Sequence, residues 1–211
     1  MTTEDGAREA IAHHGRSLFG RGLVPGSSGN LSVRLADGLL VTPTNSCLGR
    51  LDPARISRLD LEGKHVAGDP PSKEAFLHLA VYRERPHAGA IVHLHSTHAV
   101  ALSCFADTDP RDALPPLTPY SVMKLGRVPL VPYHRPGDRA LAEAVGRLAR
   151  EHHALLLANH GPVVAGDDLD AAVFGIEELE EAAKLTLLLR GAKVRHLTDE
   201  QVRALREAFP S

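Results

Sequence analysis

The chain has 211 residues, 43% of them hydrophobic and 24% charged, and its formal net charge is −2. These values are typical of one folded domain, which we expect over residues 1–211, and they exclude a long disordered chain. Without a basic block, neither nucleic acid nor a membrane surface is expected as a partner. No apolar run approaches the roughly 18 residues that span a bilayer. The N-terminus lacks the pattern of a secretory signal, and Cys47 and Cys104 match no paired motif, so we expect a cytoplasmic protein.

The predicted elements begin with a helix over residues 4–19 and a loop rich in glycine and serine over residues 25–30. Residues 31–35 alternate between apolar and polar with a period of two, which predicts a strand. The dipeptide Asp37-Gly38 is typical of a two-residue hairpin turn. We therefore expect a second strand over residues 39–42, paired antiparallel with the first.

Ser72 is suited to cap a helix that runs to about residue 83. The apolar run over residues 90–95 then predicts a buried strand. The proline-rich segment 109–136 is predicted to be extended and irregular, and we expect it at a subunit contact.

Asp138 is suited to cap another helix, and a second apolar run over residues 154–158 predicts a strand. A longer helix is expected over residues 169–190. Thr198 and Gln201 have the spacing of a capping box, which predicts a last helix docked on the body of the protein. Interleaved helices and short strands indicate an α/β or α+β fold, with a partly antiparallel sheet covered by helices.

Three histidines fall at the ends of the two apolar strands. Side chains at positions i and i+2 of a strand lie on one face, so His93 and His95 point the same way. His160 follows the second strand, in a turn closed by Gly161 and Pro162. One such histidine is more often an ordinary residue near a sheet edge, but the combined spacing favours a metal site. Three imidazoles leave a fourth position open, as in a catalytic zinc centre.

Polar residues in three other places are suited to hold a phosphate group. Glycine-rich turns offer backbone N–H groups, and the start of a helix also favours an anion. Each place taken alone is more often an ordinary turn or cap, and it is their joint presence with a metal site that favours phosphate. The candidate phosphate-binding residues are Gly29, Asn30, Thr44, Asn45, Ser72 and Lys73.

Glu74 directly follows the last of these clusters. In isolation it reads as a solvated glutamate that complements the dipole of the helix. A carboxylate beside a metal ion is also able to ligate it, or to move protons on a bound substrate. The residues alone leave both readings open.

Taken in order, these motifs resemble the class II aldolase/adducin family, whose best-known enzyme is L-fuculose-1-phosphate aldolase. The resemblance covers about residues 5–190. It implies an α/β/α sandwich around a mostly antiparallel sheet, and a homotetramer with active sites shared between subunits. It also implies that His93, His95 and His160 bind zinc or another divalent transition metal, and that Glu74 is the catalytic acid/base.

The resemblance further implies that Tyr120 is a proton donor contributed by an adjacent subunit, and that Gly29, Asn30, Thr44, Ser72 and Lys73 hold phosphate. Lys73 departs from the fuculose-phosphate aldolase, which has a serine there, so the contact to the anion differs at this position.

A narrower resemblance, carried by residues 93–104, 114–138 and 157–166, is to the 3-oxo-tetronate 4-phosphate decarboxylases of the same family. It implies metal-dependent decarboxylation of a phosphorylated sugar acid to dihydroxyacetone phosphate and CO₂, through a zinc-stabilised enediolate. A sugar-phosphate aldolase or epimerase on the same zinc site is the alternative. A non-catalytic interaction module, like the head of adducin, is a third reading, which the intact histidine set disfavours.

Overall fold

The computed structural model describes residues 3–135 and 137–209. Its centre is an eight-stranded sheet in the order β4-β3-β2-β1-β5-β8-β7-β6. All neighbouring strands pair antiparallel except β6 and β7, which are parallel. The strands are β1 (Asn30–Leu35), β2 (Gly38–Val41), β3 (Ser57–Leu59), β4 (His65–Ala67), β5 (Ala90–His93), β6 (Leu130–Val131), β7 (Ala154–Leu157) and β8 (Gly161–Gly166).

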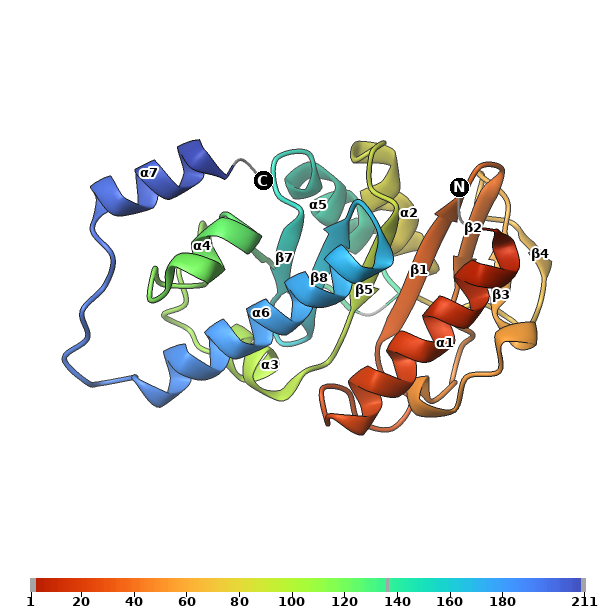
Figure 1. Cartoon of the computed structure of the whole chain (residues 1–211), viewed down its shortest axis with the longest axis horizontal. Coiled ribbons are helices and arrows are strands. Elements are labelled where there is room, and N and C mark those ends of the chain that lie inside the picture. Colours follow the sequence, from red (N-terminus) through yellow and green to blue (C-terminus); the bar gives the residue numbers. More distant parts are fainter. Residues whose placement is uncertain (1–2, 136, 210–211) are drawn as a thin grey trace.

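Helices cover both faces of this sheet, with α1 and α6 crossing in front of it and α2 and α5 behind it (Figure 1). The α-helices are α1 (Glu4–Gly20), α2 (Ala75–Glu84), α3 (Thr97–Ser103), α4 (Pro119–Leu125), α5 (Arg139–Ala149), α6 (Leu169–Leu188) and α7 (Asp199–Ala208), and short 3₁₀ helices are η1 (Leu48–Arg50) and η2 (Pro53–Arg55). The α/β/α sandwich and its mostly antiparallel sheet are confirmed.

Two hydrophobic cores lie on the two faces of the sheet. Because side chains alternate along a strand, neighbouring residues of β7 enter different cores. Leu156 belongs to the same core as Ile11 of α1 and Ile176 of α6, whereas Leu155 belongs to the core that contains Leu77 of α2 and Leu141 of α5. The apolar run of β7 is therefore continuous because both of its faces are covered.

The predicted hairpin is present, but its turn lies one residue earlier than expected. Leu35 pairs with Gly38, so the two turn residues are Ala36 and Asp37. The glycine serves a different purpose from the one predicted. A Cβ atom at Gly38 would lie 2.1 Å from the carbonyl oxygen of Leu59, so glycine lets β3 approach β2 closely.

The helix predicted to start at Ser72 begins at Ala75 instead, with Glu74 as its N-cap. The residues just before this helix are held by the segment that follows β2. Pro71 forms an isolated bridge with Pro43, and the backbone N–H of Ser72 donates to the carbonyl of Thr42. The Ser72 hydroxyl accepts from the Glu74 N–H at 3.2 Å, in a turn that precedes the helix.

The proline-rich segment was expected to be irregular, and this prediction is wrong for α4. Thr118 caps this helix through the N–H of Ser121, and Pro119 occupies the first turn, where its missing N–H costs nothing. Pro136, at the end of the segment, lies outside the described residues.

The last helix, α7, has the predicted capping box of Thr198 and Gln201. It packs against α4 rather than on the sheet, at one end of the molecule (Figure 1). Arg206 of α7 contacts Asp112 at 3.3 Å, and the N–H of Leu197 donates to the carbonyl of Pro116.

Within the described residues, no helix has both the length and the apolar character that spanning a bilayer would require. Cys47 and Cys104 are free thiols, as expected.

Candidate metal centre and active site

Three histidines meet at one end of the sheet. His93 is the last residue of β5, His95 follows it by two residues, and His160 lies in the turn between β7 and β8. The Nε2 atom of His95 lies 3.2 Å from that of His93 and 3.0 Å from that of His160. Nitrogen ligands of a tetrahedral zinc ion, at about 2.0–2.1 Å from it, are about 3.3 Å apart. The three nitrogens are therefore spaced to share one ion.

Close backbone packing brings the turn that carries His160 against the end of β5. β5 pairs antiparallel with β8, and His93 is opposite Val163. A Cβ atom at Gly161 would lie 2.2 Å from the carbonyl oxygen of Leu94, so a larger residue would push this turn away. Asn159 adopts a φ of 56°, a left-handed conformation that asparagine tolerates better than most residues. The local sequence around His160 thus shapes the approach of the third imidazole.

Burial and hydrogen bonding keep the histidines ready to act as ligands. The Nδ1–H of His93 donates to the carbonyl of Pro162 at 2.8 Å, which leaves the lone pair on Nε2 directed at the cluster. Burial lowers the pKa of His93 to about 3, and it also lowers the pKa of His95. At neutral pH both rings are therefore uncharged, the form that binds metal ions.

Glu74 completes the cluster from the start of α2. Its two carboxylate oxygens lie 3.2 Å from Nε2 of His160 and 3.5 Å from Nε2 of His93. Burial acts to raise the pKa of Glu74, but the hydrogen bond with His160, the charges of the histidines and the amide of Asn30 hold it well below its usual range.

Ligand atoms of Glu74, His93, His95 and His160 all lie within 4.8 Å of one another. Three imidazole nitrogens and one carboxylate form a donor set that fits zinc or a similar transition metal ion. The structure thus brings together the three predicted ligands and the predicted acid/base, and Glu74 lies against the histidines rather than in solvent.

The predicted phosphate-binding clusters also converge, at the neighbouring end of the β1–β2 hairpin. The N–H of Thr44 donates to the carbonyl of Pro70 at 2.9 Å, and Thr42 is tied to both Leu31 and Ser72 through backbone hydrogen bonds. Of the candidates in this region, Asn45 and Lys73 are exposed, whereas Gly29, Thr44 and Ser72 are partly buried.

Asn30 differs from the other phosphate candidates because its side chain is buried and already engaged. Its Nδ2 donates to Glu74 at 2.8 Å, and its Oδ1 contacts Nε2 of His78. The amide group of Asn30 therefore faces the carboxylate, a contact that the sequence did not predict.

A cavity of about 530 Å³ opens beside the cluster. It includes Tyr133 and His134, to which the sequence analysis assigned no role. Both lie in the segment of residues 114–138 that resembles the decarboxylases, and this resemblance was the available signal for them. The residues that line the cavity are His95, Thr97, Val100, Tyr133, His134, Asn159 and His160.

Tyr120, the predicted proton donor, does not line this cavity. It lies on α4, is 61% exposed and belongs to a helix that contacts α6 and α7. His98, close in sequence to the cluster, is instead bonded to Glu180 of α6 at 2.7 Å. Within one chain the structure therefore does not bring Tyr120 to the histidines.

Comparison with known proteins agrees with the fold and with the predicted family. The Class II Aldolase and Adducin N-terminal domain matches residues 9–187. The chain belongs to this family. The family and the fold class predicted from the sequence are thereby confirmed.

Three relatives illustrate the similarity. The 3-oxo-tetronate 4-phosphate decarboxylase of Pectobacterium atrosepticum is 52% identical over 206 residues, which cover 97% of this chain and 94% of that protein. The L-fuculose phosphate aldolase of Methanocaldococcus jannaschii is 40% identical and covers 82% of this chain and 91% of its own length. The crystal structure of YgbL from Klebsiella pneumoniae superposes with a TM-score of 0.95 at 49% identity. The match covers 98% of this chain and 100% of the YgbL chain.

Proposed function

We propose that this protein is a metal-dependent lyase that decarboxylates 3-oxo-tetronate 4-phosphate to dihydroxyacetone phosphate and CO₂. The observation that carries the proposal is about 50% identity, over nearly the whole chain, to several proteins named 3-oxo-tetronate 4-phosphate decarboxylase. The His/Glu cluster supplies the matching chemistry. Zinc is the proposed ion, although such a donor set also accepts manganese, cobalt or nickel.

The proposed substrate has a ketone at C3, β to its carboxylate. When the C1–C2 bond breaks, CO₂ leaves and the electron pair remains on C2, where it delocalises onto the C3 oxygen as an enediolate. Protonation at C2 then gives dihydroxyacetone phosphate. His93, His95 and His160 would hold a divalent ion, which would supply Lewis-acid stabilisation of the negative charge that develops on the substrate oxygens.

The remaining steps belong to side chains of the protein. The region of Gly29, Thr44 and Ser72 is proposed to hold the phosphate, with Lys73 and Asn45 at its exposed side, and so to orient the reacting carbon atoms. Glu74 is proposed to transfer the proton at C2, because its carboxylate lies beside the imidazoles of His93 and His160.

Tyr120 is proposed to act as a proton donor in a site shared between subunits of a homotetramer. Its position supports this reading, since Tyr120 is 61% exposed and lies outside the cavity of its own chain, where a neighbouring copy is able to meet it. A cytoplasmic location is part of the same proposal, because it fits a phosphorylated substrate and two free thiols.

The second candidate is a sugar-phosphate aldolase, favoured by relatives at 35–40% identity that are named L-fuculose phosphate aldolase. Release of an aldehyde from a ketose 1-phosphate produces the same enediolate, so the metal and phosphate sites serve either reaction. The aldolase must in addition remove a hydroxyl proton before the C–C bond breaks. Epimerisation on the same site is a variant of this alternative.

A direct comparison of substrates separates these candidates. The purified, zinc-loaded protein is given 3-oxo-tetronate 4-phosphate in one reaction and L-fuculose 1-phosphate in another, and CO₂ and aldehyde are measured in both. The proposal expects CO₂ from the first substrate and little aldehyde from the second. Aldehyde without CO₂ would replace the decarboxylase proposal with the aldolase alternative. The absence of both products would favour the non-catalytic interaction module.

A further inference from the structure

Strand β1 carries polar side chains on a face that is buried under α2. Asn30, Ser32 and Arg34 occupy alternate positions, so they share this face, while Leu31 points into the opposite core. β1 lies inside the sheet, between β2 and β5. A buried strand face is normally apolar, and polar groups there require partners.

Helix α2 and its cap supply those partners at intervals of four residues. Glu74, His78 and Tyr82 lie on one face of the helix and meet the polar positions of β1 in order. Two residues along a strand advance about 6.7 Å, and four along a helix about 6 Å, so the two series stay in step. We call these six residues the β1–α2 ladder, formed by Asn30 with Glu74, Ser32 with His78, and Arg34 with Tyr82.

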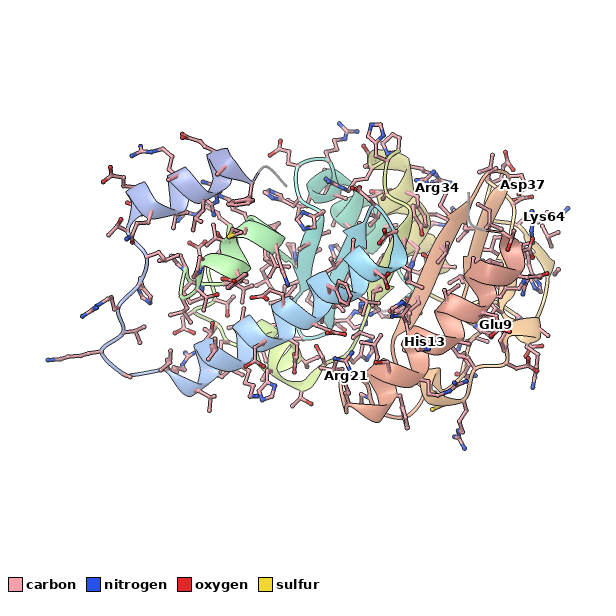
Figure 2. All side chains as sticks on the ribbon, viewed as in Figure 1. Glu9, His13, Arg21, Arg34, Asp37 and Lys64 are labelled. Carbon is pink, nitrogen blue, oxygen red and sulfur yellow. The ribbon has the colours of Figure 1, made fainter. Side chains whose placement is uncertain are left out.

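Each step of the ladder is a close contact. The Ser32 hydroxyl lies 2.6 Å from Nδ1 of His78 and 2.9 Å from the hydroxyl of Tyr82. At the far end, the Arg34 guanidinium lies 4.5 Å from the centre of the Tyr82 ring and donates to the Tyr82 carbonyl at 2.8 Å. Figure 2 labels Arg34 beside one end of β1, and Asn30, at the other end of the strand, is paired with His93.

The hydrogen bonds of the ladder have one consistent direction. The ionised carboxylate of Glu74 only accepts, so Asn30 must present its NH₂ group to Glu74 and its oxygen to His78. His78 then carries its proton on Nε2 and accepts at Nδ1 from the Ser32 hydroxyl.

The Ser32 oxygen in turn accepts from Tyr82. Every donor in this series therefore points toward Glu74.

Burial keeps the groups in the states that this direction needs. Asn30, Ser32, His78 and Tyr82 are at most 5% exposed. Burial lowers the pKa of His78 to about 4, so the ring stays neutral, and it raises the pKa of Tyr82, so the phenol keeps its proton. Because an amide stands between His78 and Glu74, the ladder is suited to orient the carboxylate rather than to conduct protons.

We propose that His78, held by Ser32, is a positioning residue that sets the place of the Glu74 carboxylate relative to the three histidines. His78 orients the amide of Asn30, and this amide restrains one oxygen of Glu74 while the other faces His160. Asn30 is also paired with His93 across β1 and β5, so the restraint begins beside the first proposed ligand. The activity arm of its test rests on the proposed function, whereas the metal arm does not.

The test compares three variants of the full-length protein, each loaded with Co²⁺, whose visible spectrum reports the geometry around the ion. His78→Leu removes the hydrogen bonds of this side chain with Asn30 and with Ser32. His78→Gln keeps an N–H group for Asn30, and Tyr82→Phe removes only the far hydroxyl while Ser32 still reaches His78. The three variants are measured for Co²⁺ spectrum, kcat, KM and melting temperature.

For His78→Leu we expect a changed Co²⁺ spectrum and a kcat lowered by about 10-fold or more, with KM within about twofold of the original. His78→Gln should recover much of both losses, and Tyr82→Phe should leave spectrum and kcat unchanged. If His78→Leu does not fold, Ser32→Ala takes its place, and a smaller change of spectrum in the same direction is expected.

Two results would overturn the positioning role. One is an unaltered spectrum and kcat in His78→Leu. The other is a loss of kcat that follows the melting temperature equally in all variants, which is the mark of a purely structural contact. A wild-type protein that releases no CO₂ would count against the proposed function alone, because the Co²⁺ spectra still report on His78.

Discussion

The Nε2 atoms of His95 and His160 lie 3.0 Å apart, although the two residues are separated by 65 positions in the sequence. Two nitrogen lone pairs at this distance repel each other unless a proton or a metal ion lies between them. The fold thus brings these nitrogen atoms to one point, where β5 and β7 end and β8 begins. Substitutions in such a cluster should therefore have effects on metal binding and activity that substitutions of ordinary surface histidines do not have.

Replacing His95 with alanine should remove bound metal and activity together. One of three nitrogen ligands is lost, so we expect metal affinity to fall by more than about 100-fold. Metal content after dialysis, measured by elemental analysis, checks this. His65→Ala, at an exposed position on β4, is the control and should keep its metal. Full activity of the His95 variant without bound metal would show that the reaction does not need the cluster.

Replacing Glu74 with glutamine should lower kcat by about 100-fold or more, because an amide keeps the shape of the side chain but neither accepts nor delivers the proton. Steady-state kinetics with the metal-loaded variant measure the effect. Glu181→Gln, on an exposed part of α6, provides the matched control. A Glu74→Gln variant with wild-type kcat would remove Glu74 from the chemistry.

Replacing Tyr120 with phenylalanine should slow turnover by about 100-fold while bound metal stays unchanged, since only a proton donor is lost. Tyr133→Phe is the comparison, because Tyr133 lines the cavity of its own chain. Oligomers mixed from Tyr120→Phe and Glu74→Ala chains should recover part of the activity if the site is shared. No recovery, with mixed oligomers verified by mass, would argue for sites within single chains.

Stability of the metal-free protein should fall as the pH drops from about 6.5 to 4.5. The pKa of His93 is lowered to about 3 and that of His78 to about 4, so the unfolded chain binds protons in this window that the folded protein does not. Each buried histidine should cost about 1 kcal/mol of unfolding free energy per pH unit.

Glu74 contributes little to the change of unfolding free energy between about pH 6.5 and 4.5. Its pKa is lowered in the folded state, so its stabilising effect is present above about 4.5 and is lost only below that pH. Urea unfolding at a series of pH values with a chelator present measures the slope, and His78→Gln should reduce it by about 1 kcal/mol per pH unit. An unchanged slope in that variant would mean that His78 is protonated in the folded protein.

The histidine cluster was predictable because the signals for it are local in the sequence. The i, i+2 spacing of His93 and His95 is set by strand geometry, and His160 stands at the end of the adjacent apolar run. By contrast, the helix start at Ala75 could not be read from the sequence, since a bridge between Pro43 and Pro71 decides it. Such a contact depends on two segments meeting in the folded chain.

The β1–α2 ladder was missed for a similar reason. In the sequence, Asn30 belongs to a glycine-rich loop as a phosphate candidate and Ser32 to a predicted strand, and His78 and Tyr82 fall in a predicted helix without a role of their own. Only the docking of α2 on β1 shows that both faces are buried and matched in spacing. The proposed role of Tyr120 comes from the family resemblance alone, because one chain does not bring this residue to the cluster.

The most direct measurement of the central claim is a coupled assay with 3-oxo-tetronate 4-phosphate. Dihydroxyacetone phosphate is followed through its reduction by an NADH-dependent enzyme, first with metal-stripped protein, then after zinc is restored. The account predicts no product from the stripped protein and rapid product after zinc is added. Product formation that is equally fast with and without metal, or none at all with zinc confirmed in the cluster, would contradict it.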